Sequence, residues 1–382
     1  MSATATDPLA RQLASLEARG RLRRLIPRAG RDFASNDYLG LSGDAEIARA
    51  VADAALRGVP AGSGGSRLLR GNAPEHEALE AKAAAFFGSE AALLMANGFA
   101  ANMALVGALP QRGDLIVADE LIHASAHDGI RQSRAGHVFA AHNNPQAFEE
   151  RIVAWRAEGG GAGGGRGRPW LLCETLYSMD GDIAPVDDLL AVSRRHGGVL
   201  MLDEAHGSGV FGPGGRGIGA HLEGAADVIS LHTCGKAIGV EGALVCGPRL
   251  MIDYLVNRAR PFIFSTAPSP LMAVAVGAAL DRVAASDDRR ARLAQLRAVA
   301  AEAICAPLGL PPSQSQILPV ILGEDKRTMA VAAALQQAGF DVRGIRPPTV
   351  APGTSRLRIS LTLNVGEDDV RALGDTLRTL VA

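Results

Sequence analysis

The chain has no excess of charge of either sign: 39 lysine and arginine residues against 40 aspartate and glutamate residues leave a net charge of −1. Nucleic-acid-binding proteins usually show a basic excess, so the composition gives no support for that class. Cysteine is also scarce, and its four positions form no CxxC pair and no Cys/His metal pattern. Three of the cysteines lie in or beside apolar runs, which predicts buried, reduced thiols.

Long apolar runs are missing as well. No stretch of about 18 uninterrupted apolar residues occurs, so we expect no membrane span. The first seven residues lack the basic-then-apolar pattern of a leader segment, and we expect a cytoplasmic protein. What is present is the composition of an ordinary globular enzyme, with 47% hydrophobic and 21% charged residues among 382. This length predicts two or three domains.

Short apolar runs alternate with helical patterns through the middle of the chain. Near-continuous apolar strands separated by helices are typical of a mainly parallel sheet covered on both faces. We therefore predict an α/β domain with about seven strands. The runs are Ala91–Ala96, Leu115–Ala118, His137–Ala140, Trp170–Cys173, Val199–Leu202, Val228–Leu231 and Ala243–Cys246.

The flanking segments are predicted from periodicity and from Gly and Pro positions. Helices are expected at 8–26, 45–57 and 74–87, although Gly20 weakens the second half of the first. The Gly-rich segment 159–167 is either a phosphate loop or a flexible surface connection. We favour the connection, because the GK[ST] ending of a P-loop is absent.

Three segments are predicted along the chain: an N-terminal helical segment (1–44), a large α/β domain (45–270), and a bridging helix followed by a smaller α+β domain (271–382). The bridge is the Ala/Leu/Arg-rich stretch 270–305. The small domain is expected to contain strands at 317–322, 341–345 and 356–360, and helices at 326–338 and 367–381.

Lys236 and Asp203 each follow one of the predicted buried strands. Ligands in parallel sheets bind at the carboxyl ends of the strands, so both side chains are expected at one edge. A lysine that forms a Schiff base and an aspartate that keeps a pyridinium nitrogen protonated are the pair that pyridoxal phosphate requires. The alternatives are a solvated lysine in a Gly-rich turn and an aspartate that caps a turn.

Other strand-end groups fit the same site, each with a structural alternative. Gly98 opens a helix and allows a phosphate to approach, or it forms a tight strand-to-helix turn. His123 stacks on a planar ring or faces solvent. Ser178 offers a hydroxyl or belongs to a turn. His206 contacts the phenolic oxygen of the cofactor or orients Asp203, and Thr233 is placed to bind phosphate.

Six motifs occur in order and together resemble the α-oxoamine synthases, which are enzymes that use pyridoxal phosphate. The resemblance runs from about residue 8 to the C-terminus, and it implies the fold type I of such transferases. The motifs are Asn36-Asp-Tyr-Leu-Gly40, Gly62-Ser-Gly-Gly-Ser-Arg67, Gly98-Phe-Ala-Ala-Asn102, Ser178-Met-Asp-Gly-Asp182, Asp203-Glu-Ala-His-Gly207 and Thr233-Cys-Gly-Lys236.

The resemblance implies a role for each matching residue. Lys236 would be the Schiff-base lysine, Asp203 the partner of the ring nitrogen, His123 the stacking group and His206 the contact to O3′. The remaining cofactor-binding residues would be Gly98, Phe99, Ser178 and Thr233. The residues expected to bind substrate are Arg23, Asn36, His123, Thr349 and Arg358.

The C-terminal residues 346–360 are most similar to family members that condense L-alanine with a pimeloyl thioester in biotin synthesis, an acyltransferase reaction. The resemblance implies a homodimer with a shared active site. The thioester donor is left open between coenzyme A and an acyl carrier protein. Two further alternatives are a sister enzyme such as a glycine C-acetyltransferase, and an α/β scaffold protein that has kept the fold without catalysis.

Overall fold

The computed structural model describes residues 7–160 and 167–381, and it folds as two compact units. The large unit comprises Leu39–Ser178 and Asp182–Arg290, and the small unit comprises Met1–Tyr38, Met179–Gly181 and Ala291–Ala382. The N-terminal segment thus groups with the C-terminal third of the chain. The three-part division at residues 44 and 270 stays a prediction. None of the described helices is long and apolar enough to cross a lipid bilayer.

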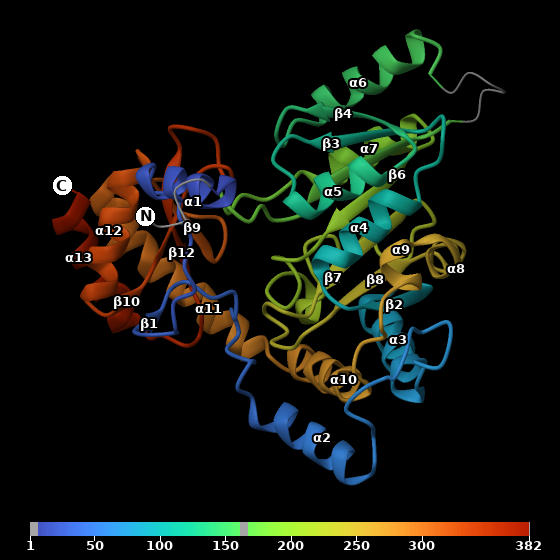
Figure 1. The fold of residues 1–382 in the computed structure, drawn as a ribbon, viewed down its shortest axis with the longest axis horizontal. Helices are drawn as coiled ribbons and strands as arrows, with labels where there is room; N and C mark the ends of the chain where they lie inside the picture. Colours follow the sequence, from blue (N-terminus) through green and yellow to red (C-terminus); the bar gives the residue numbers. More distant parts are fainter. Residues whose placement is uncertain (1–6, 161–166, 382) are drawn as a thin grey trace. The chain divides into compact units, whose positions relative to one another are not determined.

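The large unit contains a seven-stranded sheet with one strand at each of the seven predicted runs, which confirms the predicted α/β class (Figure 1). The strands are β2 (Ala91–Met95), β3 (Leu115–Asp119), β4 (Gly136–Ala140), β5 (Pro169–Glu174), β6 (Val199–Asp203), β7 (Val228–Thr233) and β8 (Ala243–Gly247). Their order across the sheet is β2-β8-β7-β6-β5-β3-β4. Only β8 runs antiparallel to its neighbours β2 and β7. Every other pair of neighbouring strands is parallel.

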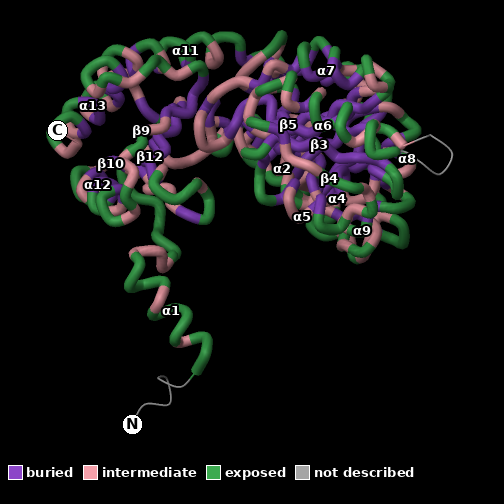
Figure 2. The backbone as a smooth tube through the Cα atoms, turned by 90° about the horizontal axis from the view of Figure 1, so that it is seen from above, coloured by how far each residue is buried: buried purple, intermediate pink, exposed green. Residues whose placement is uncertain are grey.

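Helices cover both faces of this sheet, so all of its strands except the edge strand β4 are buried (Figure 2). On one face Leu105 belongs to the same core as Ile116 of β3, and on the other face Phe148 and Leu189 share a core with the next residue, Val117. This alternation follows from the period of two in a strand. The helices of the large unit are α2 (Ala45–Leu56), α3 (Pro74–Phe87), α4 (Gly98–Ala108), α5 (Ala124–Gln132), α6 (Pro145–Ala157), α7 (Val186–Arg195), η2 (Pro213–Gly215), α8 (Arg249–Arg258), α9 (Arg260–Ile263) and α10 (Pro270–Ala284).

The small unit has a three-stranded antiparallel sheet of order β11-β12-β9 and a separate parallel pair, β1 with β10. Its strands are β1 (Arg31–Asp32), β9 (Ile317–Gly323), β10 (Phe340–Asp341), β11 (Arg343–Ile345) and β12 (Ser355–Ser360). Its helices are α1 (Pro8–Ala18), η3 (Ala301–Cys305), η4 (Ala306–Leu308), α12 (Asp325–Gln337) and α13 (Glu367–Val381). Helix α11 (Asp287–Ala300) begins in the large unit and ends in the small one.

Three predicted elements differ in detail from the structure. The helix expected at 8–26 ends at Ala18, because Gly20 adopts a left-handed backbone with φ of 67°. The stretch 270–305 is broken between α10 and α11. At the break Arg290 donates from its guanidinium to the carbonyl of Val283, which also accepts the backbone N–H of Ser286. The strand expected at 341–345 is two short strands on either side of Val342.

The four cysteines are free and buried, as predicted for three of them. Residues 161–166 of the Gly-rich segment lie outside the described part of the chain, so the choice of a surface connection over a phosphate loop stays a prediction.

Candidate active site

Three polar residues of the large unit lie at the carboxyl ends of adjacent strands. Glu174 ends β5, Asp203 ends β6 and Thr233 ends β7. In the sheet register Glu174 pairs with Asp203, and Asp203 pairs with Leu231 on the third strand. Because these strands are parallel, their polar ends share one edge of the sheet, where ligands of such folds bind. The sequence predicted this edge.

Lys236 lies in the loop after β7, and its Nζ atom is 2.7 Å from Nε2 of the buried His206. Backbone bonds from Gly239 to Lys236 and from Val240 to Cys234 close this loop. Gly239 has φ of 78°, and a side chain there would come within 2.6 Å of the Leu41 backbone. The lysine is therefore half-buried and carried on a tight turn, and its role as the Schiff-base lysine stays a prediction.

Asp203 is 6% exposed and is held by two donors. The side-chain amide of Asn102 donates to Oδ2 at 2.6 Å, and the backbone N–H of Ala205 donates to Oδ1 at 2.9 Å. Asn102 also donates to Ser125 Oγ at 3.1 Å, and Ser125 Oγ lies 2.7 Å from His123 Nδ1. A chain of hydrogen bonds thus joins Asp203 to His123.

This chain of bonds indicates the state of His123. Since Ser125 accepts from Asn102, its hydroxyl hydrogen is directed to His123 Nδ1, which then accepts. Desolvation lowers the pKa of His123, while the charges of Asp203 and Lys236 act on it in opposite directions. Together these effects favour a neutral imidazole. A neutral ring can offer its face to a planar ligand without carrying a charge into the site.

Glu174 lies beside Asp203, and its carboxyl group is buried with few hydrogen-bond partners. Its Oε2 accepts the backbone N–H of Ser178 at 3.2 Å, and Oε1 has no hydrogen-bond partner among the described residues. Burial, reinforced by the charge of Asp203, raises the pKa of Glu174 to about 8. The protonated form is favoured at pH 7, so this pair of carboxyl groups carries one negative charge rather than two.

The start of α4 forms a cradle for an anion. The Asn97 side chain accepts from the N–H of Ala100, while the first-turn N–H groups of Gly98 and Phe99 have no intrahelical partner. A side chain at Gly98 would stand 3.2 Å from Thr233 Oγ1. Glycine at this position therefore keeps open the space between the helix start and the threonine hydroxyl.

The predicted substrate residues of the small unit form two groups. The buried Arg358 donates from one guanidinium nitrogen to Asn36 Oδ1 at 3.1 Å and to Tyr38 Oη at 3.3 Å. Separately, Arg23 lies 3.5 Å from Thr349 Oγ1. The structure thus brings Arg358 to Asn36 and Arg23 to Thr349 within this unit. The five substrate assignments stay predictions.

Several residues of the cluster were not selected from the sequence. Asn102 and Ser125 bridge Asp203 and His123, and Tyr38 binds Arg358. Asn102 and Tyr38 lie inside quoted motifs, but a motif does not say which of its side chains face each other. Glu174 directly follows the predicted run Trp170–Cys173, and this position is the sequence signal that could have found it.

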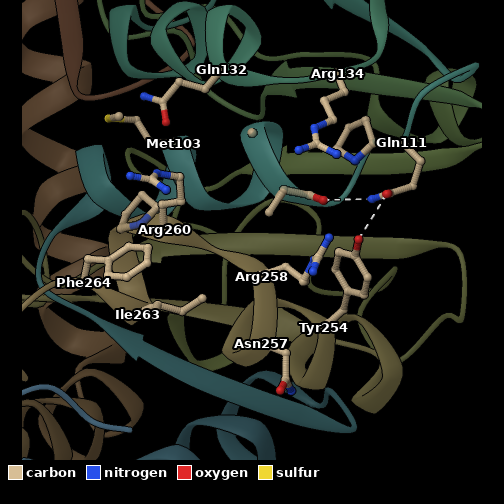
Figure 3. A pocket seen from close by; sticks show the side chains of 14 residues that line it. Met103, Gln111, Gln132, Arg134, Tyr254, Asn257, Arg258, Arg260, Ile263 and Phe264 are labelled. Atoms are coloured by element: carbon tan, nitrogen blue, oxygen red, sulfur yellow. Dashed lines mark hydrogen bonds between the residues drawn. The ribbon is translucent and has the colours of Figure 1, made fainter. Parts of the chain in front are cut away.

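A separate cavity of about 650 Å³ lies in the large unit and contains none of these residues (Figure 3). It is lined from α4, α5, α8 and α9, and Arg134, Arg258 and Arg260 contribute three cations. The bond from Tyr254 Oη to Gln111 Oε1, 3.1 Å long, lies at its wall. This cavity is therefore distinct from the strand-end cluster.

The family model for class I and II aminotransferases matches residues 30–375. The 8-amino-7-oxononanoate synthase of Anaeromyxobacter dehalogenans strain 2CP-1 is 43% identical over 95% of this chain and 92% of its own length. The synthase of the same name from Aromatoleum aromaticum is 41% identical, over 98% of this chain and 99% of its own length. The chain belongs to the 8-amino-7-oxononanoate synthase family. This confirms the predicted family and the fold type I of pyridoxal phosphate enzymes.

Solved structures agree with the family. The chain is similar to the serine palmitoyltransferase of Sphingomonas wittichii, with a TM-score of 0.87 and 28% identity. This match covers 98% of this chain and 97% of that chain. The 8-amino-7-oxononanoate synthase of Francisella tularensis gives a TM-score of 0.76 and 27% identity, covering 92% of this chain and 97% of that one. The chain is also similar to a serine palmitoyltransferase that carries pyridoxal phosphate, with a TM-score of 0.83 and 26% identity. This match covers 91% of this chain and 86% of that chain.

Proposed function

We propose that this protein is a pyridoxal phosphate enzyme that condenses L-alanine with a pimeloyl thioester to give 8-amino-7-oxononanoate, carbon dioxide and a free thiol. The observation that carries the proposal is the grouping of Lys236, His206 and Asp203 at one sheet edge, with Lys236 Nζ 2.7 Å from His206. Membership of the synthase family supports the substrates.

The residues at this edge fit the cofactor. The cradle between Gly98 and Thr233 suits a phosphate group, and Phe99 and Ser178 lie on the adjoining segments. Asp203, fixed by Asn102, is a partner for a protonated ring nitrogen. His123 would stack on the ring, and His206 would contact its O3′. The bound cofactor supplies an electron sink that stabilises a carbanion at the amino-acid α-carbon.

The chain's own groups then handle the proton. The Nζ amine of Lys236, when it is not bonded to the cofactor, would take the proton from the alanine α-carbon. His206 holds that amine in place by its contact of 2.7 Å. The α-carbon attacks the thioester carbonyl, the thiol leaves, and carbon dioxide is lost from the resulting β-keto acid. Lys236 returns the proton to the α-carbon of the product.

The small unit is proposed to bind the substrates. Arg358 would bind the alanine carboxylate through its guanidinium, which Asn36 and Tyr38 hold by their side-chain oxygens. Arg23 and Thr349 would bind the acyl partner. The basic residues around Arg23 suit either coenzyme A or an acidic carrier protein as the donor.

We propose further that the enzyme is a cytoplasmic homodimer with a shared active site. Large apolar side chains of the large unit are exposed, among them Leu69 at 85%, Phe264 at 70% and Phe99 at 45%. A dimer would cover such surface. The four free, buried cysteines fit a reducing compartment. Sedimentation analysis of the purified protein tests the dimer, since a monomer at micromolar concentration would contradict it.

The substrates are tested by offering alanine or glycine with either pimeloyl-CoA or acetyl-CoA and analysing the products by mass spectrometry. We expect product mainly from alanine and pimeloyl-CoA. Preference for glycine and acetyl-CoA would identify a glycine C-acetyltransferase instead. A purified protein that gains no visible absorbance band with pyridoxal phosphate would favour a scaffold protein without catalysis. Repeating the assay with a pimeloyl carrier protein separates the two donors.

A further inference from the structure

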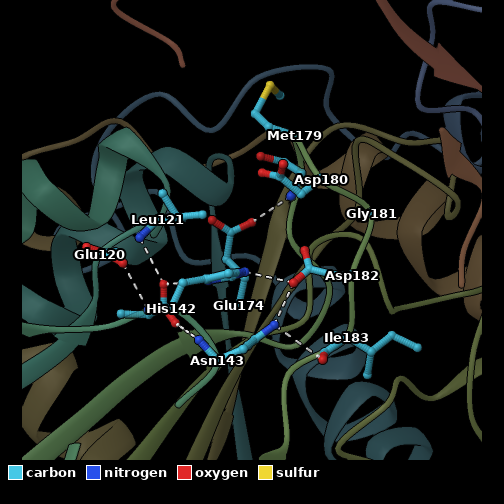
Figure 4. Close-up of polar contacts among 12 residues, drawn as sticks. Glu120, Leu121, His142, Asn143, Glu174, Met179, Asp180, Gly181, Asp182 and Ile183 are labelled. Atoms are coloured by element: carbon cyan, nitrogen blue, oxygen red, sulfur yellow. Dashed lines mark hydrogen bonds and ion pairs between the residues drawn. The ribbon is translucent and has the colours of Figure 1, made fainter. Parts of the chain in front are cut away.

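A histidine outside the proposed reacting group lies between two carboxylates of the large unit (Figure 4). His142 Nδ1 is 2.9 Å from Asp119 Oδ1, and His142 Nε2 is 2.7 Å from Asp182 Oδ2. Its ring also meets the edge of the Tyr177 ring, with centroids 4.4 Å apart. Both ring nitrogens therefore serve a carboxylate, an arrangement that requires a proton on each of them.

Asn143, the next residue, binds the same two aspartates through neutral N–H donors. The backbone N–H of Asn143 donates to Asp119 Oδ2 at 2.8 Å, and its side-chain amide donates to Asp182 Oδ2 at 2.6 Å. Asn143 has φ of 51°, the left-handed region that residues other than glycine rarely adopt. The chain thus adopts an uncommon backbone conformation in order to place two consecutive residues between the same carboxylates.

Each of the two aspartates fixes a segment that carries a predicted cofactor residue, Asp119 by its carboxylate and Asp182 by its backbone carbonyl. Asp119 ends β3 and accepts the N–H of Leu121 at 2.9 Å, just before His123 caps α5. Asp182 accepts from the N–H of Tyr177 through its backbone carbonyl at 3.0 Å, closing the segment that contains Ser178. His142 therefore connects Asp119, which lies just before His123 in the chain, with Asp182, which closes the segment that contains Ser178.

The electrostatics favour a permanent charge at this bridge. Burial disfavours the imidazolium, but hydrogen bonds to Asp119 and Asp182 and the charges of these carboxylates outweigh burial and raise the pKa of His142 to about 10. The pKa of Asp119 is lowered, because its bonds to His142 and to backbone N–H groups outweigh burial. The bridge is thus ionic throughout the physiological pH range.

We propose that His142 is a positioning residue of the cofactor site, whose bridge between Asp119 and Asp182 sets the relative placement of His123 and Ser178. The inference rests on the proposed function, since the roles of His123 and Ser178 come from it. His142 does not touch the cofactor in this account; it acts through the two segments that it holds.

The test is a titration of cofactor-free protein with pyridoxal phosphate, followed by its visible absorbance. The His142→Gln variant removes the charge and one of the two bonds, and we expect its cofactor dissociation constant to rise roughly ten-fold, as for coupled neighbours. His221→Gln is the matched control, because His221 also pairs with an aspartate, at 2.6 Å, but both side chains are exposed. The control should bind as the wild type does.

A double-mutant cycle separates positioning from simple loss of stability. If His142 acts through Asp182, the effects of His142→Gln and Asp182→Asn on cofactor binding will not add. His142→Lys, which restores a positive charge, should recover part of the affinity even if His142→Gln folds poorly. A variant that melts earlier but binds the cofactor with wild-type affinity would overturn the inference.

The outcomes also separate this inference from the proposed function. A wild-type protein that does not bind pyridoxal phosphate contradicts the function itself. A wild-type protein that binds it, together with a His142→Gln variant of equal affinity, contradicts only the positioning role.

Discussion

His123 and His142 both lie at the carboxyl edge of the large unit's sheet, after the adjacent parallel strands β3 and β4, yet their surroundings are opposite. His123 meets a serine hydroxyl at 2.7 Å and has a lowered pKa. His142 meets two aspartates and has a pKa of about 10. The same residue type is thus a neutral ring in one place and a fixed cation in the other.

This difference indicates that the two groups of residues at the sheet edge have different roles. The group around Lys236, Asp203 and His123 is connected through the contact of Lys236 with His206 and through the neutral amide of Asn102 and the hydroxyl of Ser125. In the bridge, the His142 cation is paired with the carboxylates of Asp119 and Asp182, and the bridge holds backbone segments. Changes to the first group should cost activity, and changes to the bridge should cost stability and cofactor affinity.

The largest expected effect is that of Lys236→Ala. Loss of the amine that moves the α-proton should reduce turnover by about 10⁴-fold or more, the upper end for a general base. The melting temperature of the cofactor-free variant should stay within about 2 °C of wild type, because the change removes no core packing. Turnover assays and thermal melts check both. Ordinary turnover would end the assignment.

Asp203→Asn should have the next largest effect. The variant keeps the shape and a hydrogen-bonding group beside Asn102 but removes the charge that pairs with the ring nitrogen. We expect turnover to fall roughly 10²- to 10³-fold, the size associated with one lost electrostatic contact in an active site. A change of absorbance maximum in the holoenzyme should accompany it. Wild-type turnover would exclude the proposed role of Asp203.

The bridge of Asp119, His142 and Asp182 should make the stability of the folded protein depend on pH. The folded pKa of His142 is raised above its unfolded value of 6.5 to about 10, so its contribution is fully present below pH 6.5 and is lost as pH rises through 10. The groups facing it are Asp119, Asp182, Glu120 and Tyr177.

Denaturant unfolding of wild type and His142→Gln at several pH values measures this contribution. The wild type should be more stable by about 2 kcal/mol near pH 6. The difference should shrink between pH 7 and pH 10. A difference that does not change with pH would show that His142 carries no stabilising charge.

The smallest expected effect is a difference between the pH titrations of the His123 and His142 rings, which NMR measures directly. In the cofactor-free protein, the His123 signals should titrate below the ordinary value of 6.5, and those of His142 should not titrate between pH 5 and 8. Signals are assigned with His123→Gln and His142→Gln. Similar titration of both rings would remove the contrast on which this account rests.

The sequence predicted the sheet well, because every strand is a short apolar run and both sheet faces are covered. It also predicted that Asp203 and Lys236 lie near the carboxyl ends of β6 and β7, as they do in the structure, while their roles stay predictions. The antiparallel direction of β8 was not predicted, because direction depends on how the chain returns to the sheet and leaves no trace in apolar periodicity.

The contacts that organise the site were beyond sequence reasoning. His142 lies far along the chain from Asp182, and only the pairing of β3 with β4 and β5 brings their loops together. Asn102 faces Asp203 because of how α4 packs on the sheet. Such pairings depend on tertiary packing, and a single sequence gives no signal for them.

The most direct test is to reduce the purified, cofactor-loaded protein with borohydride and locate the attached pyridoxyl group by peptide mass spectrometry. The account predicts one modified site, at Lys236, and none in the Lys236→Ala variant. A pyridoxyl group on another lysine, or a protein that never acquires one, would contradict the assignment of the cofactor site.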